Sequence, residues 1–238
     1  MCGIAGIIRF DKQPIESDRL RDACLNLRHR GPDDSGTWLH EPTQLVGLAA
    51  VRLAILDPSP AGHQPMLRQN RFVLVHNGEI YNYRELRREL VALGEIFTTD
   101  SDTEVILAAC IRWGTEAMRR FAGMWALAFY DTQTCRGFLA RDRLGVKPLF
   151  YTANAKRLAF ASELGPLTKL VDLDCVINTS AVVQHLQFGF IAGDHTIYAG
   201  ANRLEPGHVL SFDQNGSLKS ERYYSLPVMA TAKPIDYA

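Results

Sequence analysis

The chain has 238 residues, of which 47% are hydrophobic and 22% charged, and its 26 basic side chains balance its 26 acidic ones. This is the composition of an ordinary globular protein, and it provides no basic surface for a nucleic acid. No apolar run approaches the ~20 residues that a membrane-spanning helix needs, and the first residues lack the pattern of a secretory signal. We therefore expect neither a nucleic-acid partner nor a membrane.

The cysteines indicate the cellular compartment. There are five, an odd number with wide spacings and no C-x-x-C pair: Cys2, Cys24, Cys110, Cys135 and Cys175. This pattern fits neither a disulfide framework nor a zinc site. We expect no bound metal and a reducing, cytoplasmic location.

The first third of the chain predicts mostly strands. A strand is expected over residues 3–9, and a helix over about 17–27 with Ser17 as its N-cap. Residues 28–36 are polar and read as turns. Two further strands are expected over 45–56 and 71–76, with Asn77-Gly78 ending the second.

The remainder mixes helices and short strands. A helix over 83–93 has leucines on one face and Gly94 at its end, and another begins at Ser101 with a capping-box pattern and runs to residue 113. Short helices are expected at 116–121 and 180–187, and strands at 124–131, 136–141, 149–153, 158–162, 196–198 and 208–213. Because strands and helices do not alternate regularly, we predict an α+β architecture of antiparallel sheets with helices outside.

Cys2 is the first candidate for chemistry. Removal of Met1 would leave the thiol of Cys2 beside its own α-amino group. A thiol and an amine with a reference pKa of roughly 7.7–8.0 form a self-contained nucleophile and base. Read by position alone, an inert buried cysteine at the start of a strand is the alternative.

Five motifs stand in order along the chain: CGIAG from Cys2, RHRGPD from Arg28, NGEIYN from Asn77, SDTE from Ser101 and RDRLGVKPL from Arg141. Together they resemble the amino-terminal half of glutamine-hydrolysing asparagine synthetase, a class II glutamine amidotransferase. The resemblance implies a four-layer αββα amino-terminal-nucleophile hydrolase sandwich of antiparallel sheets. It also implies a glutaminase domain over residues 1–225, and a linker over 226–238 leading to a synthetase domain that is not in this sequence.

The resemblance assigns a catalytic centre. Cys2 matches the nucleophile, and the Asn77 side chain with the Gly78 backbone N–H matches the oxyanion hole, where each donor is worth ~3 kcal/mol. From the residues alone, Asn77-Gly78 is also the strongest signal of a hairpin turn.

The resemblance likewise assigns the glutamine pocket. Arg52 matches the bidentate clamp of the α-carboxylate, although the family usually carries His or Arg where Val51 stands. Asp102, with Glu79 nearby, matches the acceptor of the α-ammonium group, and a further stretch lines the pocket: Leu53, Ala54, Ile55 and Leu56. Read alone, Arg52 is a surface charge, and Asp102 is a carboxylate favoured by the first turn of a helix.

Other polar residues receive structural interpretations. His29, His63 and His76 are read as ordinary structural histidines, because the α-amine already supplies a base. Asp33 and Asp34 are read as turn formers.

The implied function is hydrolysis of glutamine to glutamate and ammonia through a Cys2 thioester, with no cofactor. The ammonia would serve an asparagine-synthetase-type amidation in a C-terminal synthetase domain or subunit, and ATP and Mg²⁺ are expected only there. A homodimer is compatible with the sequence. The alternatives are the glutaminase domain of an enzyme that amidates another acid, a thiol amidohydrolase and a catalytically silent docking domain.

Overall fold

The structure, a computed structural model, describes residues 1–227. Its strands form two six-stranded sheets in which neighbouring strands run antiparallel. The first sheet has the order β10-β8-β9-β1-β3-β2. Its strands are β1 (Gly3–Arg9), β2 (Asp34–Leu39), β3 (Val46–Arg52), β8 (Phe150–Asn154), β9 (Arg157–Ala161) and β10 (Asn202–Arg203).

The second sheet has the order β12-β11-β7-β6-β5-β4. Its strands are β4 (Met66–Arg68), β5 (Phe72–Ile80), β6 (Gly123–Asp131), β7 (Arg136–Arg141), β11 (His208–Phe212) and β12 (Leu218–Arg222). The longest pairing joins β5 to β6, from Phe72 opposite Asp131 to Ile80 opposite Gly123.

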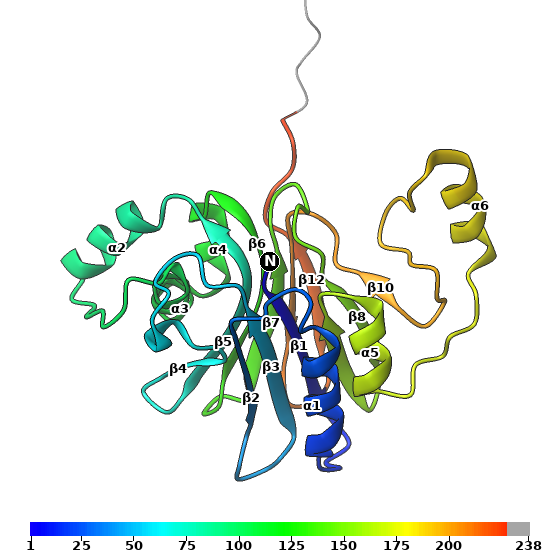
Figure 1. Ribbon diagram of the computed structural model, residues 1–238, viewed down its shortest axis with the longest axis horizontal. Helices are drawn as coiled ribbons and strands as arrows, with labels where there is room; N and C mark the ends of the chain where they lie inside the picture. Colours follow the sequence, from blue (N-terminus) through cyan, green and yellow to red (C-terminus); the bar gives the residue numbers. More distant parts are fainter. Residues whose placement is uncertain (228–238) are drawn as a thin grey trace, which may run out of the picture.

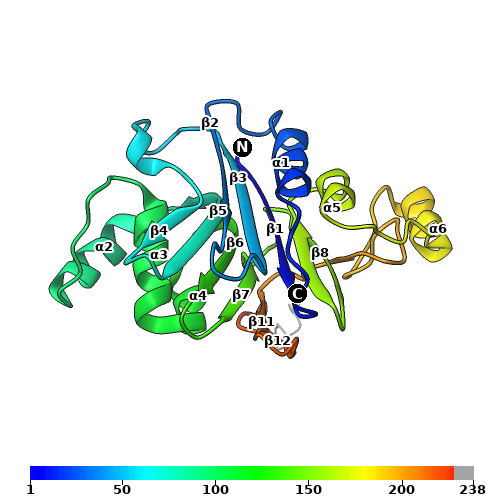
Figure 2. The ribbon, with the colours of Figure 1, turned by 90° about the horizontal axis from the view of Figure 1, so that it is seen from below.

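Helices cover both outer faces of the sheet pair. α1 (Ser17–Asn26) and α5 (Leu164–Leu170) lie on the first sheet, and three helices lie on the second: α2 (Tyr83–Ala92), α3 (Asp102–Trp113) and α4 (Ala117–Arg120). Figures 1 and 2 show these layers, with α6 (Thr179–Phe188) standing apart beyond β10. Short 3₁₀ turns cover Pro60–Gly62 and Gly114–Glu116.

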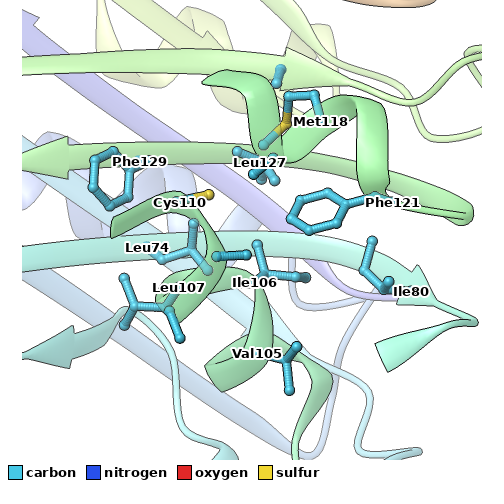
Figure 3. Close-up of a cluster of buried hydrophobic side chains, with 14 of the residues drawn as sticks. Leu74, Ile80, Val105, Ile106, Leu107, Cys110, Met118, Phe121, Leu127 and Phe129 are labelled. Carbon is cyan, nitrogen blue, oxygen red and sulfur yellow. The ribbon is translucent and has the colours of Figure 1, made fainter. Parts of the chain in front are cut away.

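Three apolar clusters hold the layers together. The middle cluster joins the two sheets through side chains such as Ile4 and Phe160 from one and Val75 from the other. A second packs α1 and α5 on the first sheet. Figure 3 shows the third, in which Ile106 of α3 and Phe121 meet strands of the second sheet. Because β1 is buried on both faces, it reads as a continuous apolar run. The predicted four-layer αββα arrangement is confirmed.

Several element boundaries differ from the sequence expectation. β3 ends at Arg52, so residues 53–56 form a loop and not the end of a strand. The turn-rich stretch 28–36 was expected to hold no strand, yet β2 begins within it because Asp34 pairs with Arg52. Tyr198 makes only an isolated bridge to Ile177, so the strand expected over 196–198 does not form. In each case, whether a residue belongs to a strand depends on pairing with a segment far away in the sequence, and local propensity does not contain this information.

The helix ends also refine the expectation. α1 begins at Ser17 itself, with Glu16 at the cap position and no side-chain cap bond. Ser101 does cap α3, accepting a hydrogen bond from the Thr103 N–H. The linker expected over 226–238 lies almost wholly outside the described residues.

Candidate active site

One pocket gathers most of the residues that the sequence singles out. It opens at the start of β1, the end of β3, the second half of β5 and the beginning of α3. The N-terminus lies near the middle of the molecule, at this junction of the layers (Figure 1). The lining residues are Met1, Cys2, Arg52, Leu53, Ile55, Leu56, Gln64, His76, Asn77, Gly78, Glu79, Ser101, Asp102, Thr103, Met124 and Lys147.

The Cys2 thiol lies half-buried in this pocket and donates to the Leu53 carbonyl over 3.7 Å. Burial raises the pKa of the Cys2 thiol above its ordinary value, although the Leu53 backbone, the positive chain terminus and Arg52 act in the opposite direction. At neutral pH the thiol is therefore protonated, and it needs a base before it can act as a nucleophile.

Arg30 holds the backbone of Cys2. Its Nε donates to the Cys2 carbonyl over 3.0 Å, and its Nη1 donates to Glu163 Oε1 over 2.8 Å. The same carboxylate oxygen lies 3.0 Å from His29 Nε2. The sequence analysis gave Arg30 no role, because its partners stand 28 and 133 positions away in the chain.

Asn77 lies inside β5, which continues through Asn77 and Gly78 to Ile80. The hairpin-turn reading of this pair is therefore wrong. Side chains alternate along a strand, so Asn77 faces the same side as Val75, toward the space between the sheets. Its side chain is fully buried, and neither amide atom has a hydrogen-bond partner among residues 1–227. A buried amide without partners is unusual in a folded protein, and here both of its atoms are free to bond a group that enters the pocket.

Gly78 is required by its place in the sheet. Its φ is +146°, and a Cβ built on it would stand 2.0 Å from the Met124 carbonyl oxygen. Any side chain would therefore push β5 away from β6. The contact that demands a glycine here is with the neighbouring strand β6.

Arg52 is buried and borders the pocket, yet its guanidinium is occupied by the loop that follows β3. Nη1 donates to the Ser59 carbonyl over 3.1 Å, and Nη2 donates to the carbonyls of Leu56, over 2.8 Å, and Asp57. Both Nη2 hydrogens are thus used within the protein. A bidentate contact with a carboxylate would require at least one of these carbonyls to be released.

Two carboxylates also line the pocket, from β5 and α3 of the second sheet's side of the sandwich, whereas Arg52 ends β3 of the first sheet. Asp102, at the first turn of α3, is buried, and its Oδ2 accepts from the Ile80 N–H over 3.0 Å. Asp102 therefore ties α3 to the end of β5 and lines the pocket as well. Glu79, half-buried, also lines it.

The loop after β3 contributes three of its four expected residues. Leu53, Ile55 and Leu56 line the pocket, whereas Ala54 borders a neighbouring hollow beside Asp33. The Ala54 N–H donates to Asp33 Oδ2 over 2.8 Å, so Asp33 anchors this loop.

Part of the pocket wall is a buried polar cluster of Gln64, His76 and Thr103, to which the sequence alone assigned no role in the pocket. Gln64 Oε1 accepts from the His76 N–H over 2.6 Å, and His76 Nδ1 lies 3.3 Å from Thr103 Oγ1. Burial lowers the pKa of His76 below its ordinary value, so the imidazole is neutral at neutral pH. His76 was read as structural, but it lines the pocket. Its place beside Asn77 in the NGEIYN strand was the available signal.

No helix within residues 1–227 is long and apolar enough to cross a membrane.

Comparison with known proteins gives the chain relatives along nearly its whole length. It is 37% identical to the "Putative asparagine synthetase [glutamine-hydrolyzing] 2" of Methanocaldococcus jannaschii, a match that covers 95% of this chain and 47% of the relative. It is 35% identical to the "Asparagine synthetase [glutamine-hydrolyzing] 3" of Bacillus subtilis, over 95% of this chain and 37% of that protein. The chain thus spans less than half of these relatives.

Solved structures support the fold. The glutamine phosphoribosylpyrophosphate amidotransferase of B. subtilis superimposes with a TM-score of 0.66 at 22% identity, covering 94% of this chain and 49% of that one. The predicted amino-terminal-nucleophile hydrolase fold is confirmed by this likeness. Residues 1–224 match the glutamine amidotransferase domain family. With its pocket built around Cys2, the chain belongs to that family.

Proposed function

We propose that this chain hydrolyses glutamine to glutamate and ammonia, using Cys2 as an amino-terminal nucleophile. The observation that carries the proposal is the buried, unpartnered amide of Asn77 in the pocket that holds the Cys2 thiol. Such an amide supplies one donor for an oxyanion, and the Gly78 backbone N–H supplies the second.

The reaction would begin after removal of Met1, when the α-amino group of Cys2 takes the proton of the thiol. The thiolate attacks the side-chain carbonyl carbon of glutamine, and the resulting oxyanion is held by Asn77 and Gly78. When this intermediate collapses, the C–N bond breaks and the ammonium group of Cys2 protonates the departing ammonia. Water then adds to the thioester, and glutamate leaves as the thiol is restored.

Arg52 and Asp102 are proposed to hold the two charged ends of glutamine. Arg52 would receive the α-carboxylate, and Asp102, with Glu79, the α-ammonium group. This orientation is supported by the lining of the pocket, to which β3 of the first sheet contributes Arg52 and α3 contributes Asp102. The loop carbonyls that now occupy Arg52 imply that this loop shifts when glutamine binds.

The proposed fate of the ammonia follows the names of the relatives. Both are called glutamine-hydrolysing asparagine synthetases and are more than twice as long as the matched region. We propose that a synthetase domain or subunit uses the ammonia to amidate aspartate, with ATP and Mg²⁺ bound there and no cofactor in this domain. A cytoplasmic location is supported by the free thiols of all five cysteines. A homodimer stays a prediction.

The test is glutaminase activity and labelling by a glutamine-analogue electrophile. The wild-type chain should release ammonia from glutamine without ATP, metal or aspartate, and intact mass should show that Met1 is absent from the active protein. Cys2→Ala should abolish turnover and labelling. The matched control is Cys24→Ala, which should retain both, because Cys24 is also a free thiol but is a buried residue of α1 that does not line the pocket.

Two results would overturn this proposal. Ammonia release that survives Cys2→Ala would exclude the nucleophile, and full activity with Met1 retained would exclude the α-amine as the base. A wild-type chain that binds glutamine without turnover would instead indicate a silent docking domain.

A further inference from the structure

Lys147 is a buried lysine whose side chain reaches the candidate active site. It is 5% exposed and lines the pocket beside Met1 and Cys2. Its Nζ donates to Met1 Sδ over 3.2 Å, across 146 positions of sequence. Among residues 1–227, the one lysine that forms an ion pair is the exposed Lys219, which pairs with Glu221. The Lys147 ammonium therefore has no carboxylate partner in the described part of the chain.

The backbone of Lys147 is held on both sides by the motif in which it stands. Arg141 Nε donates to the Lys147 carbonyl over 2.7 Å, and Asp142 Oδ2 accepts from the Lys147 N–H over 2.9 Å. Asp142 also accepts from the N–H groups of Leu144 and Val146. These bonds close the turn between β7 and β8 and fix the point from which the lysine side chain enters the pocket. The position of the Lys147 backbone at the mouth of the pocket is therefore built into the fold.

An unpaired ammonium group is costly to bury, so its effect on neighbouring groups matters. The two arginines near Cys2 have partners within the described residues. Arg30 is paired with Glu163 over 2.8 Å, and the guanidinium of Arg52 is surrounded by backbone carbonyls. The Asp102 carboxylate accepts from the neutral Ile80 N–H and keeps its charge, which acts to raise the pKa of the Cys2 thiol.

Two titratable groups of β5 also border the pocket. Glu79 is half-buried and lies on the pocket wall. Burial lowers the pKa of His76, and the charge of Lys147 acts in the same direction, so His76 adds no cation. Apart from the chain terminus itself, Lys147 is thus the one cation among the described pocket-lining residues that is neither paired with a carboxylate nor surrounded by carbonyls.

We propose that the Lys147 ammonium keeps the α-amino group of processed Cys2 in its neutral, proton-accepting form. This inference rests on the proposed function, in which that amine is the base. Met1 is bonded directly to the Cys2 nitrogen, so the Met1–Lys147 contact places the ammonium within one residue of the future amine. A nearby like charge disfavours protonation of the amine. The reaction itself is unchanged: the thiol proton still moves to the α-amine. Lys147 does not contact the substrate in this proposal and acts only by disfavouring protonation of that amine.

The first experiment is the pH profile of kcat/KM for glutamine hydrolysis. Lys147→Met removes the charge at similar length and should move the acid limb to higher pH by about one unit. Lys147→Arg keeps a cation and should leave the limb close to that of the wild type. Lys156→Met is the matched control, since Lys156 is exposed in the β8–β9 hairpin, and it should leave the profile unchanged.

A second readout avoids turnover. In a Cys2→Ser background the α-amine is kept and the thiol is removed, so the pH dependence of N-terminal acetylation by acetic anhydride, followed by peptide mass mapping, reports the amine alone. Adding Lys147→Met should raise the midpoint of this curve by about one unit. Lys147→Gln serves in the same two assays should the methionine variant not fold.

The inference is overturned if the acid limb and the acetylation midpoint are the same with and without the Lys147 charge, or if Lys156→Met shifts them equally. If the proposed function itself is wrong, the experiments give a different result. In that case the wild type shows no Cys2-dependent ammonia release, while the acetylation curve still reports whether Lys147 acts on the amine.

Discussion

Replacing Asn77 by alanine should separate catalysis from stability. Removal of one oxyanion donor lowers kcat by about 10²–10³-fold, or ~3–4 kcal/mol of transition-state stabilisation. The effect on folding should be small. Neither amide atom has a partner in the part of the chain that the structure describes. The truncation therefore breaks no hydrogen bond there, and each such bond contributes about 1 kcal/mol. Because Asn77 lines an open pocket, the change also creates no sealed void. We expect the free energy of unfolding to fall by less than about 1 kcal/mol.

Gln64 provides the matched control, because it is a second buried amide in the same pocket whose oxygen does have a partner. It accepts from the His76 N–H over 2.6 Å. Gln64→Ala leaves that buried donor unsatisfied, at a cost of about 1–3 kcal/mol. For a chain of this size a loss of ~2 kcal/mol lowers Tm by roughly 4–8 °C, and kcat should change much less than in Asn77→Ala.

The two variants are compared by glutaminase kinetics and by urea unfolding on the same preparations. The reasoning fails if Asn77→Ala retains a kcat within a few-fold of the wild type. It also fails if Asn77→Ala loses as much stability as Gln64→Ala, since Asn77 would then be a structural amide whose partners form in solution.

Two further predictions concern charged residues. Arg52→Lys should raise KM for glutamine more than it lowers kcat, because the carboxylate contact is present in ground and transition states alike; equal effects in steady-state kinetics would contradict the proposed role. The second concerns Asp131, whose pKa is lowered to about 2 by two hydrogen bonds from Arg71 of 2.7 Å each. Its pKa in the unfolded chain is ~3.9, so this stabilisation is complete above about pH 4 and is lost as the pH falls toward 2. Urea unfolding should show that the free energy of unfolding falls less steeply between pH 5 and pH 3 in Asp131→Asn than in the wild type. The same pH dependence in both proteins would refute this role of Asp131.

Local sequence determined much of this protein. The apolar run of β1, the leucine face of α2 and the Ser101 cap of α3 depend on neighbours a few residues away, so their periods and capping residues could be read directly. The order of five short motifs was enough to indicate the family and the nucleophile Cys2. These features need no knowledge of which segments meet in space.

Tertiary structure decided where the strands end and which side chains share the pocket. Asn77-Gly78 has the composition of a turn, yet pairing with β6 carries the strand through both residues. Arg30 meets the Cys2 carbonyl, and Lys147 meets Met1, only because the two sheets bring distant segments to one edge of the sandwich. Strand pairing and burial are long-range interactions whose free energy exceeds local propensity. The sequence alone could therefore indicate Cys2 as the proposed nucleophile, but only the folded sandwich shows the charges that surround it.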